Sequence, residues 1–450
     1  MNLILGAGLS GLSCSYHLGH ENCIILEKSL HAFGHLHAEY RDGFTWDQGP
    51  HVSFTKHDYV RELFANSVGG EFEEYAIKAS NYYKGHWIDH PAQSSLYQLP
   101  ADLRAACVSS FLESRSSGLS NSVPANYAEW LERAMGAKFA DTFPAAYTRK
   151  YWTREPRELT TEWIGQRVFY PEIDDVLQGS KGPLDRKTHY ITKIRYPKKG
   201  GYQSFVKSLA DNANILFGAE VCQVDLIEKC VFTTDGSRYP YSRLVNTLPL
   251  PVFISMCKQA TPPVLEACRQ LSCSQLMIVN VTAPHPTKRP ENWMYVYDED
   301  KLSTRINCTE KLTLGNAPVG KTGVQAEVYF SRHKPLLLNP SEVVERVKKE
   351  LVEMGLVEED AYRKGLVNAS TSYAPWANVI FDHQTRPALC VIWDWLAGYG
   401  LTRESDDLHP LTDWEKISKA ERGPVVMAGR FGQWKYYWTD DCVMRGKHIF

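Results

Sequence analysis

Residues 2–27 read NLILGAGLSGLSCSYHLGHENCIILE, and this stretch decides the fold class. Residues 2–5 predict a short buried strand, residues 6–11 a tight turn, residues 12–18 the start of a helix, and residues 22–27 a second strand. Continuous apolar strands joined by a helix are typical of a βαβ unit, in which both faces of a parallel sheet are buried. We therefore expect an α/β protein.

The turn between these strands has the pattern GxGxxG, directly after a strand and at the start of a helix. In a Rossmann-type unit the first glycine makes the turn, the second lets a pyrophosphate approach the backbone, and the third lets helix and strand pack closely. The helix N-terminus offers free N–H groups to the phosphate charge. An acid at the end of the second strand accepts hydrogen bonds from ribose hydroxyls and disfavours the 2′-phosphate of NADP. The predicted dinucleotide contacts are Gly6, Gly8, Leu9, Ser10, Gly11, Glu27 and Lys28.

The segment after the second strand favours FAD over NAD. Residues 29–43 (SLHAFGHLHAEYRDG) form a short loop, and residues 44–51 (FTWDQGPH) would bring the chain back over the cofactor. A glycine-rich turn that binds nothing is the alternative, but a strand, a helix and an acid in register favour dinucleotide binding. We expect an α/β fold with a Rossmann-type FAD-binding domain of the glutathione-reductase-like kind, interleaved with an α+β substrate domain.

The length and composition are those of an ordinary globular protein. A chain of 450 residues predicts two or three domains, because a single core rarely grows so large. Lys and Arg number 50 and Asp and Glu 52, so the net charge of -2 gives no general attraction to nucleic acid or to an anionic membrane. Eleven cysteines without a CxxC pair or a metal-ligand grouping predict free thiols and no metal site.

The sequence predicts neither a signal peptide nor a membrane span. The first strand begins at residue 2, which leaves no room for a charged n-region and an apolar h-region before it. No stretch reaches the roughly 18 apolar residues of a spanning helix. Together with an odd number of cysteines, which favours a reducing compartment, these features lead us to expect a cytoplasmic protein.

Later segments predict the rest of this domain and a separate sheet. The expected elements are helices at residues 126–135, 200–212 and 341–354, strands at 215–221, 244–248, 274–283, 292–299, 323–331 and 424–428, and a hairpin at 230–241. Because no linker or repeat separates them, we predict interleaved domains. The FAD-binding domain would comprise residues 1–75, 195–265 and 415–450, and the substrate domain residues 76–194 and 266–414.

Three segments resemble a group of flavoproteins that includes UDP-galactopyranose mutase, protoporphyrinogen oxidase and the flavin amine oxidases. Residues 47–51 (DQGPH) are similar to the mutase GPH segment, whose histidine lies near the flavin ring. Residues 147–159 (YTRKYWTREPREL) resemble the mutase pattern YTxKxWxxxPxEL, which lines the nucleotide-sugar cleft. Residues 429–437 (GRFGQWKYY) look like the mutase signature GRLGxYxYY.

The resemblance implies roles for individual residues. Residues 304–306 are similar to a family TRI segment whose arginine pairs with the substrate diphosphate, and Glu327 falls in the strand that follows. The implied substrate contacts are Trp152 in the nucleotide pocket and Arg305, Tyr373 and Tyr436 at the diphosphate, with Arg167 as a further cation. The implied cofactor contacts are Gly34, His35, Gly49, Pro50, His51, Val221, Gly429 and Arg430, where Val221 contacts adenine through its backbone and Arg430 approaches the flavin.

Three positions depart from the mutase pattern. The glycine pair after the second strand is Gly34-His35 here, and Trp438 stands where the mutase has an acid. Residues 193–205 (KIRYPKKGGYQSF) are more similar to the oxidases. These departures leave the identity of the substrate open.

The resemblance implies a reaction in which reduced flavin attacks the anomeric carbon of a nucleotide sugar and the nucleoside diphosphate leaves. Arg305 and Arg167 would stabilise the departing diphosphate. One alternative is an FAD-dependent oxidase or dehydrogenase, in which the flavin accepts a hydride from the substrate. Another is a protein that keeps FAD only structurally. In each case we expect a small-molecule partner, and the sequence leaves open whether the chain forms a homo-oligomer.

The same residues also have structural interpretations. His51 fits a satisfied histidine beside a turn, and arginines commonly form surface salt bridges. The aromatic cluster at residues 434–438 fits core packing as well as a substrate platform. The lysines of residues 193–199 fit a solvated loop.

Overall fold

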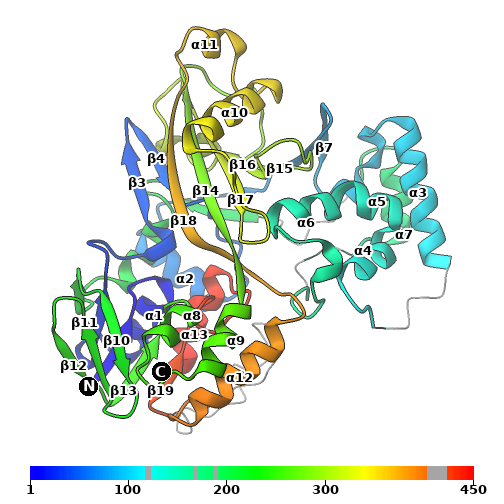
Figure 1. The fold of residues 1–450 in the computed structure, drawn as a ribbon. Helices are drawn as coiled ribbons and strands as arrows, with labels where there is room; N and C mark the ends of the chain where they lie inside the picture. Colours follow the sequence, from blue (N-terminus) through cyan, green and yellow to red (C-terminus); the bar gives the residue numbers. More distant parts are fainter. Residues whose placement is uncertain (117–122, 166–167, 169, 186–190, 192, 403–422) are drawn as a thin grey trace.

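The computed structural model describes residues 1–116, 123–165, 168, 170–185, 191, 193–402 and 423–450. It contains a five-stranded sheet near both chain termini and a seven-stranded sheet above it, and a group of helices lies to the right in this view (Figure 1). This mixed architecture confirms the expected α/β fold class.

The five-stranded sheet is parallel throughout, with the order β19-β13-β1-β2-β9. Its strands are β1 (Asn2–Leu5), β2 (Cys23–Glu27), β9 (Ile215–Phe217), β13 (Arg243–Asn246) and β19 (Val425–Met427). Helix α1 (Leu9–Leu18) packs closely on α13 (Thr439–Ile449), because Gly446 has no Cβ and one there would lie 2.2 Å from Ser13 Oγ. Segments from the beginning, middle and end of the chain therefore form one sheet, whereas the domain boundaries stay a prediction.

Smaller elements surround this sheet. They are the hairpin of β3 (Ala38–Arg41) and β4 (Phe44–Asp47), the pair of β5 (Phe72–Ala76) and β8 (Lys193–Pro197), the three-stranded sheet of β10 (Val221–Asp225), β11 (Cys230–Thr233) and β12 (Arg238–Pro240), and the helices α2 (Asp58–Ser67), α8 (Leu250–Met256), α9 (Pro262–Gln270) and α12 (Thr385–Ala397). The antiparallel pairing of β11 with β12 confirms the hairpin predicted at residues 230–241.

The structure corrects two predicted elements. The helix expected at residues 200–212 is a 3-10 helix, η8 (Tyr202–Leu209), which begins after two glycines of positive φ. The single strand expected at residues 215–221 is divided between β9 and β10, which belong to different sheets. Gly218 has φ +72, a conformation that glycine adopts readily, and it turns the chain between them.

The seven-stranded sheet has the order β18-β14-β17-β16-β15-β6-β7. Its strands are β6 (Ala79–Tyr83), β7 (His86–Asp89), β14 (Ser272–Ala283), β15 (Trp293–Val296), β16 (Arg305–Cys308), β17 (Thr322–Phe330) and β18 (Asn368–Ile380). Apolar side chains on one face, such as Val279 and Val324, pack against α10 (Pro340–Glu353), and α11 (Glu359–Arg363) follows it. The opposite face carries polar side chains, described below.

The helices on the right of Figure 1 belong to the segment between β7 and β8. They are α3 (Ala101–Ser116), α4 (Tyr127–Met135), α5 (Ala137–Ala140), α6 (Ala146–Tyr151) and α7 (Ile173–Gly179). Helix α4 begins at an Asn126 side chain that accepts a hydrogen bond from Glu129 N, which satisfies a free N–H group of its first turn. Within the described residues, we find no helix long and apolar enough to cross a membrane.

Candidate functional site at the glycine corner and the polar face of the large sheet

The glycine corner has the geometry that the sequence predicts. Gly6 has φ +95, which a side chain rarely adopts, and it makes the turn after β1. A Cβ on Gly11 would lie 2.0 Å from the carbonyl oxygen of Gly6, so this glycine permits the close packing of α1 on the strand. Gly8 precedes α1 as an extended residue, and the first turn of α1 contains no acidic side chain. The N-terminus of α1 is therefore open to an anion.

A second loop lies directly against this corner. Gly34 has φ +52, and a Cβ there would lie 3.1 Å from the Cα of Gly8. The carboxylate of Glu27 accepts hydrogen bonds of 2.8 Å from both Ala7 N and Ser29 N, which fix it at the end of β2. Gly8 and Gly34 expose their backbones without a side chain, which suits the pyrophosphate of a dinucleotide, and the fixed Glu27 carboxylate beside them suits its ribose.

Two further glycines bring the implied flavin-contacting segments to this corner. Gly429 has φ +85, and a Cβ there would lie 2.6 Å from Ser10 Oγ on α1. Gly49 has φ +84, and a Cβ there would lie 3.1 Å from a carboxylate oxygen of Glu327. The Gly49-Pro50-His51 segment therefore lies against the large sheet, and the preceding Gln48 reaches the loop beside the corner, where its Oε1 lies 3.1 Å from His35 Nδ1.

His51 is held in its neutral form. Its Nδ1 lies 2.8 Å from the carbonyl oxygen of Gly49, so this nitrogen carries the proton and donates it. Burial lowers the pKa of His51 to about 4, and the nearby His35, Arg305 and Arg430 act in the same direction. An uncharged imidazole at neutral pH can accept a hydrogen bond or a proton through Nε2.

Arg305 and Glu327 form a pair on the polar face of the sheet. Arg305 Nη2 donates to Glu327 Oε1 at 2.8 Å and to the hydroxyl of Tyr329 at 3.0 Å, and its Nε donates to Glu327 Oε2. The side chain of Glu327 is 1% exposed and that of Arg305 19% exposed. Burial alone disfavours the charge, but Glu327 outweighs it and holds the pKa of Arg305 well above its ordinary value.

Aromatic side chains connect Arg305 to Arg430. The guanidinium of Arg305 lies 5.4 Å from the ring centre of Tyr151, whose hydroxyl is 3.4 Å from that of Tyr436. Arg430 lies 5.0 Å from the ring centre of Tyr436, and Trp152 packs on the same ring at 5.4 Å. Residues from α6, the large sheet and the C-terminal segment thus meet in one aromatic cluster with two guanidinium groups.

The backbone holds Arg430 in this position. Its Nε donates to the carbonyl oxygen of Tyr437 at 2.8 Å, and its Nη1 donates to the carbonyl oxygen of Ala377 at 3.3 Å. These acceptors come from the C-terminal segment and from β18, so Arg430 also ties the two sheets together. Carbonyl acceptors leave the positive charge of the guanidinium without a neutralising carboxylate at these contacts.

The structure does not bring Tyr373 to this cluster. Tyr373 pairs with Met277 across the sheet, whereas Arg305 and Glu327 are in register with Ile278. Because consecutive residues of a strand point to opposite faces, Tyr373 lies on the face away from Arg305. Its side chain is 49% exposed, and its hydroxyl donates to Gln275 Oε1 at 2.9 Å.

The other predicted residues lie apart from the aromatic cluster. Val221 begins β10, beside the five-stranded sheet, and Lys28 is exposed directly after β2. Arg167 lies outside the described residues. The roles implied for all of these residues stay predictions.

Sequence reasoning gave no individual role to several tyrosines of the cluster, although Tyr147 and Tyr151 lie in the segment 147–159 that resembles the mutase. Tyr147 stacks on Tyr151 with ring centres 5.4 Å apart and contacts Tyr295 of β15 at 5.6 Å. Burial raises the pKa values of Tyr147 and Tyr151 well above the ordinary value, so both phenols keep their protons at neutral pH. Their spacing of four residues places them on one face of α6, which is the signal that could have found them.

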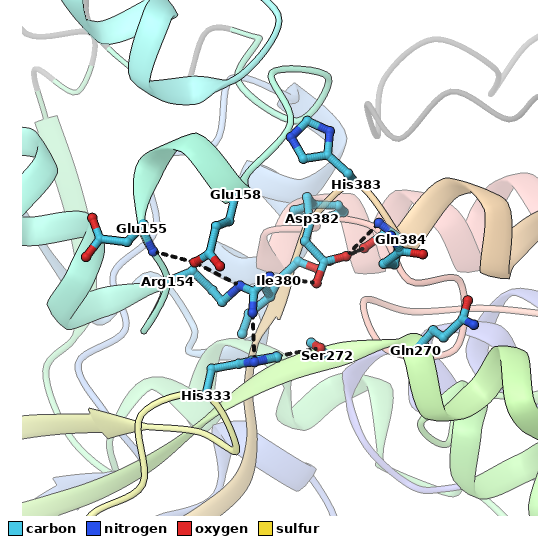
Figure 2. Close-up of polar contacts among 12 residues, drawn as sticks. Arg154, Glu155, Glu158, Gln270, Ser272, His333, Ile380, Asp382, His383 and Gln384 are labelled. Atoms are coloured by element: carbon cyan, nitrogen blue, oxygen red, sulfur yellow. Dashed lines mark hydrogen bonds and ion pairs between the residues drawn. The ribbon is translucent and has the colours of Figure 1, made fainter.

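A polar network fixes the wall that carries Trp152. Figure 2 shows Arg154 between His333, Glu158 and Asp382. Arg154 Nη1 lies 2.7 Å from His333 Nδ1, and His333 Nε2 lies 3.0 Å from Ser272 Oγ at the start of β14. Two residues before His333, Ser331 accepts a 2.7 Å hydrogen bond from Thr153 Oγ1. The segment after α6 is therefore attached to the ends of strands in the large sheet.

These features fit a flavoprotein in which a dinucleotide corner lies apart from an aromatic cluster with two guanidinium groups. The family of flavin-containing amine oxidoreductases matches residues 9–386, and the chain belongs to this family. The protein is thus an FAD-dependent enzyme, as the sequence predicts. The glycine corner, the open helix N-terminus and the fixed Glu27 fit the pyrophosphate and ribose of FAD.

Solved structures share this fold. A reduced UDP-galactopyranose mutase is 20% identical and has a TM-score of 0.86, and the match covers 100% of this chain and 94% of that one. A protein assigned as a protoporphyrinogen oxidase from Exiguobacterium sp. 255-15 is 16% identical, with a TM-score of 0.70 and coverage of 99% and 96%. A fatty acid isomerase from P. acnes that produces CLA is 13% identical, with a TM-score of 0.62 and coverage of 99% and 96%. At these identities the likeness concerns the fold alone.

Proposed function

We propose that this enzyme transforms a nucleotide sugar, or a similar activated sugar, by UDP-galactopyranose mutase-like chemistry. The observation that carries the proposal is the convergence of Arg305 and Arg430 on one aromatic cluster through Tyr151 and Tyr436. Guanidinium groups bind the oxygens of a diphosphate well. Tyrosine and tryptophan rings offer apolar faces and hydroxyls to a base and a sugar.

The charges of the cluster also disfavour an amine as substrate. An aliphatic amine is protonated at neutral pH and would need a carboxylate partner. Glu327 is the carboxylate found within this cluster of described residues, and Arg305 already neutralises it. His51 contributes no negative charge. The electrostatic balance therefore supports an anionic substrate within a family named for amine oxidation.

Each part of the chain has a separate role in this proposal. Reduced FAD, when bound, supplies a nucleophile for the anomeric carbon of the sugar. Arg305 binds the diphosphate and Trp152 lines the nucleotide pocket. Tyr436 lies between the two guanidinium groups, where its hydroxyl contacts the diphosphate. The residues proposed to hold FAD belong to the discontinuous domain predicted from the sequence. The proposed substrate contacts come from both domains: Trp152 and Arg305 from the substrate domain, and Tyr436 from the C-terminal part of the FAD-binding domain.

The test supplies nucleotide sugars to the FAD-loaded enzyme, once oxidised and once reduced with dithionite, without another acceptor. Isomerisation by the reduced enzyme alone is the expected result. Bleaching of the oxidised flavin by the substrate would instead support the FAD-dependent oxidase or dehydrogenase. Arg305→Lys should raise the KM for the nucleotide sugar at least tenfold with FAD retained. The matched control is Arg386→Lys, which alters an exposed Arg–Glu pair with Glu162 and should leave KM unchanged.

A further inference from the structure

His35 is a titratable side chain in the loop that follows β2. It follows Gly34, whose backbone lies against Gly8 at the pyrophosphate corner. The imidazole is exposed, and its Nδ1 lies 3.1 Å from Gln48 Oε1, next to the Gly49-Pro50-His51 segment. A titratable side chain therefore lies beside the proposed pyrophosphate site.

The ring of His35 also faces the C-terminal segment. Its centre lies 6.1 Å from that of Phe431, which directly follows Arg430. Both segments that we propose to hold the flavin ring, residues 49–51 and residues 429–430, thus flank His35. The imidazole therefore lies beside both the pyrophosphate corner and the two segments that the resemblance places at the flavin.

The surroundings of His35 favour its neutral form. Although the residue is exposed, the protein atoms around the ring desolvate it and lower its pKa; Gln48 acts in the opposite direction, and Arg430 adds to the lowering. His51 and His35 each disfavour a proton on the other. Because Gln48 Oε1 accepts from Nδ1–H, the lone pair of Nε2 stays available for a proton.

We propose that His35 contacts the bound flavin and takes up one proton when the flavin is reduced. Two electrons and one proton convert FAD to its anionic reduced form, and the negative charge this creates offsets the effect of Arg430 on the imidazole. The second proton then binds at Nε2 of His35, so that reduction consumes two electrons and two protons. This inference depends on the proposed placement of the flavin and not on the identity of the substrate.

The experiment measures the reduction equilibrium of the FAD-loaded protein between pH 7 and pH 8, with dithionite as reductant and a redox dye as reference. The wild-type constant should fall about 100-fold per pH unit, because two protons accompany two electrons. His35→Gly and His35→Gln should bind FAD but show a tenfold fall, since one proton is lost. His31→Gly is the matched control. His31 is exposed, stacks on His37 at 3.8 Å, and should leave the 100-fold dependence unchanged.

The spectrum of the reduced flavin shows where the second proton resides. An anionic reduced flavin at pH 7.5 in the wild type is expected, which assigns the second proton to the protein. The proposal would be overturned if the reduction constant had the same pH dependence in the wild type and in His35→Gly. It would also be overturned if the constant of His35→Gln still fell 100-fold per pH unit. A failure of the nucleotide-sugar assay leaves these measurements unaffected, because they contain no substrate. The two proposals therefore fail separately.

Discussion

Replacing Arg305 by methionine should lower the free energy of unfolding by more than the loss of its hydrogen bonds would, because it leaves the buried carboxylate of Glu327 without its cation. The substitution keeps a long side chain among Tyr151, Trp293 and Tyr329 but removes the donors to Glu327 and to the Tyr329 hydroxyl. The carboxylate of Glu327, 1% exposed, then remains buried without its cation. Breaking a buried ion pair on one side typically costs about 3–5 kcal/mol.

A double variant separates the contribution of the pair from that of the packing. Arg305→Met/Glu327→Gln removes both charges, so we expect it to recover more than half of the stability lost in Arg305→Met. In thermal unfolding, about 4 kcal/mol corresponds to a decrease of roughly 4 °C if a chain of this length unfolds as one unit. Chemical denaturation of the four proteins of the cycle gives the coupling energy directly.

The outcome of the cycle decides between a charge effect and a packing effect. A coupling energy above about 2 kcal/mol agrees with a buried pair. If the two single variants instead add to give the double variant, Glu327 does not depend on Arg305 and the electrostatic reasoning fails. The control is the exposed pair Arg386–Glu162. The same cycle on this pair should give a coupling energy of less than about 1 kcal/mol.

Three further perturbations test other parts of the structure. Gly8→Val should fold but lose FAD, because a Cβ at Gly8 meets only the Cα of Gly34 at 4.0 Å, and a fully loaded yellow protein would contradict the pyrophosphate placement. Burial raises the pKa of Asp47 to about 6, so the stability it contributes is fully present below about pH 4 and is lost as the pH rises through 6. This pH dependence changes the free energy of unfolding by about 3 kcal/mol, and Asp47→Asn should remove it from denaturation curves measured across this pH range. Burial and two nearby arginines lower the pKa of His333, so its link to Arg154 is present above about pH 6.5 and is lost at lower pH. In the wild type, hydrogen exchange in residues 149–158, relative to the intrinsic rate at each pH, should become faster as the pH falls, and in His333→Gln this acceleration should be absent. If the variant keeps the same acceleration, His333 is not the cause of it.

The cofactor side of the molecule was predictable because it is local in sequence. The glycine corner and Glu27 lie within one βαβ unit. Each glycine is required there by a local steric constraint, so the sequence pattern alone reveals it. Gly11 illustrates this: a Cβ there would lie 2.0 Å from the oxygen of Gly6, five residues earlier. The hairpin at residues 230–241 and the helix at 126–135 were predictable for the same reason.

The aromatic cluster that we propose as the substrate site was only partly predictable, because folding brings it together from distant segments. The pairing of Arg305 with Glu327 depends on the register of β16 against β17, which the sequence does not state. A shift of one residue would move either side chain to the other face. Tyr373 shows the consequence: the resemblance implies a diphosphate contact for it, but its register with Met277 places it on the face away from Arg305.

The two sides of the site also differ in how the chain encodes them. Four glycines of positive φ, Gly6, Gly34, Gly49 and Gly429, leave out the side chains that would otherwise meet Thr247, Gly8, Glu327 and Ser10. The cofactor surface is thus defined by missing Cβ atoms, and almost any side chain there would have to displace backbone or a neighbour. The proposed substrate surface is defined by tyrosines and paired charges, which can be exchanged without moving the backbone as long as the buried charges stay paired. Because Gly49 contacts Glu327, the two surfaces meet at this carboxylate. A change of substrate charge would therefore require Glu327 and Arg305 to change together, while the FAD corner could remain the same.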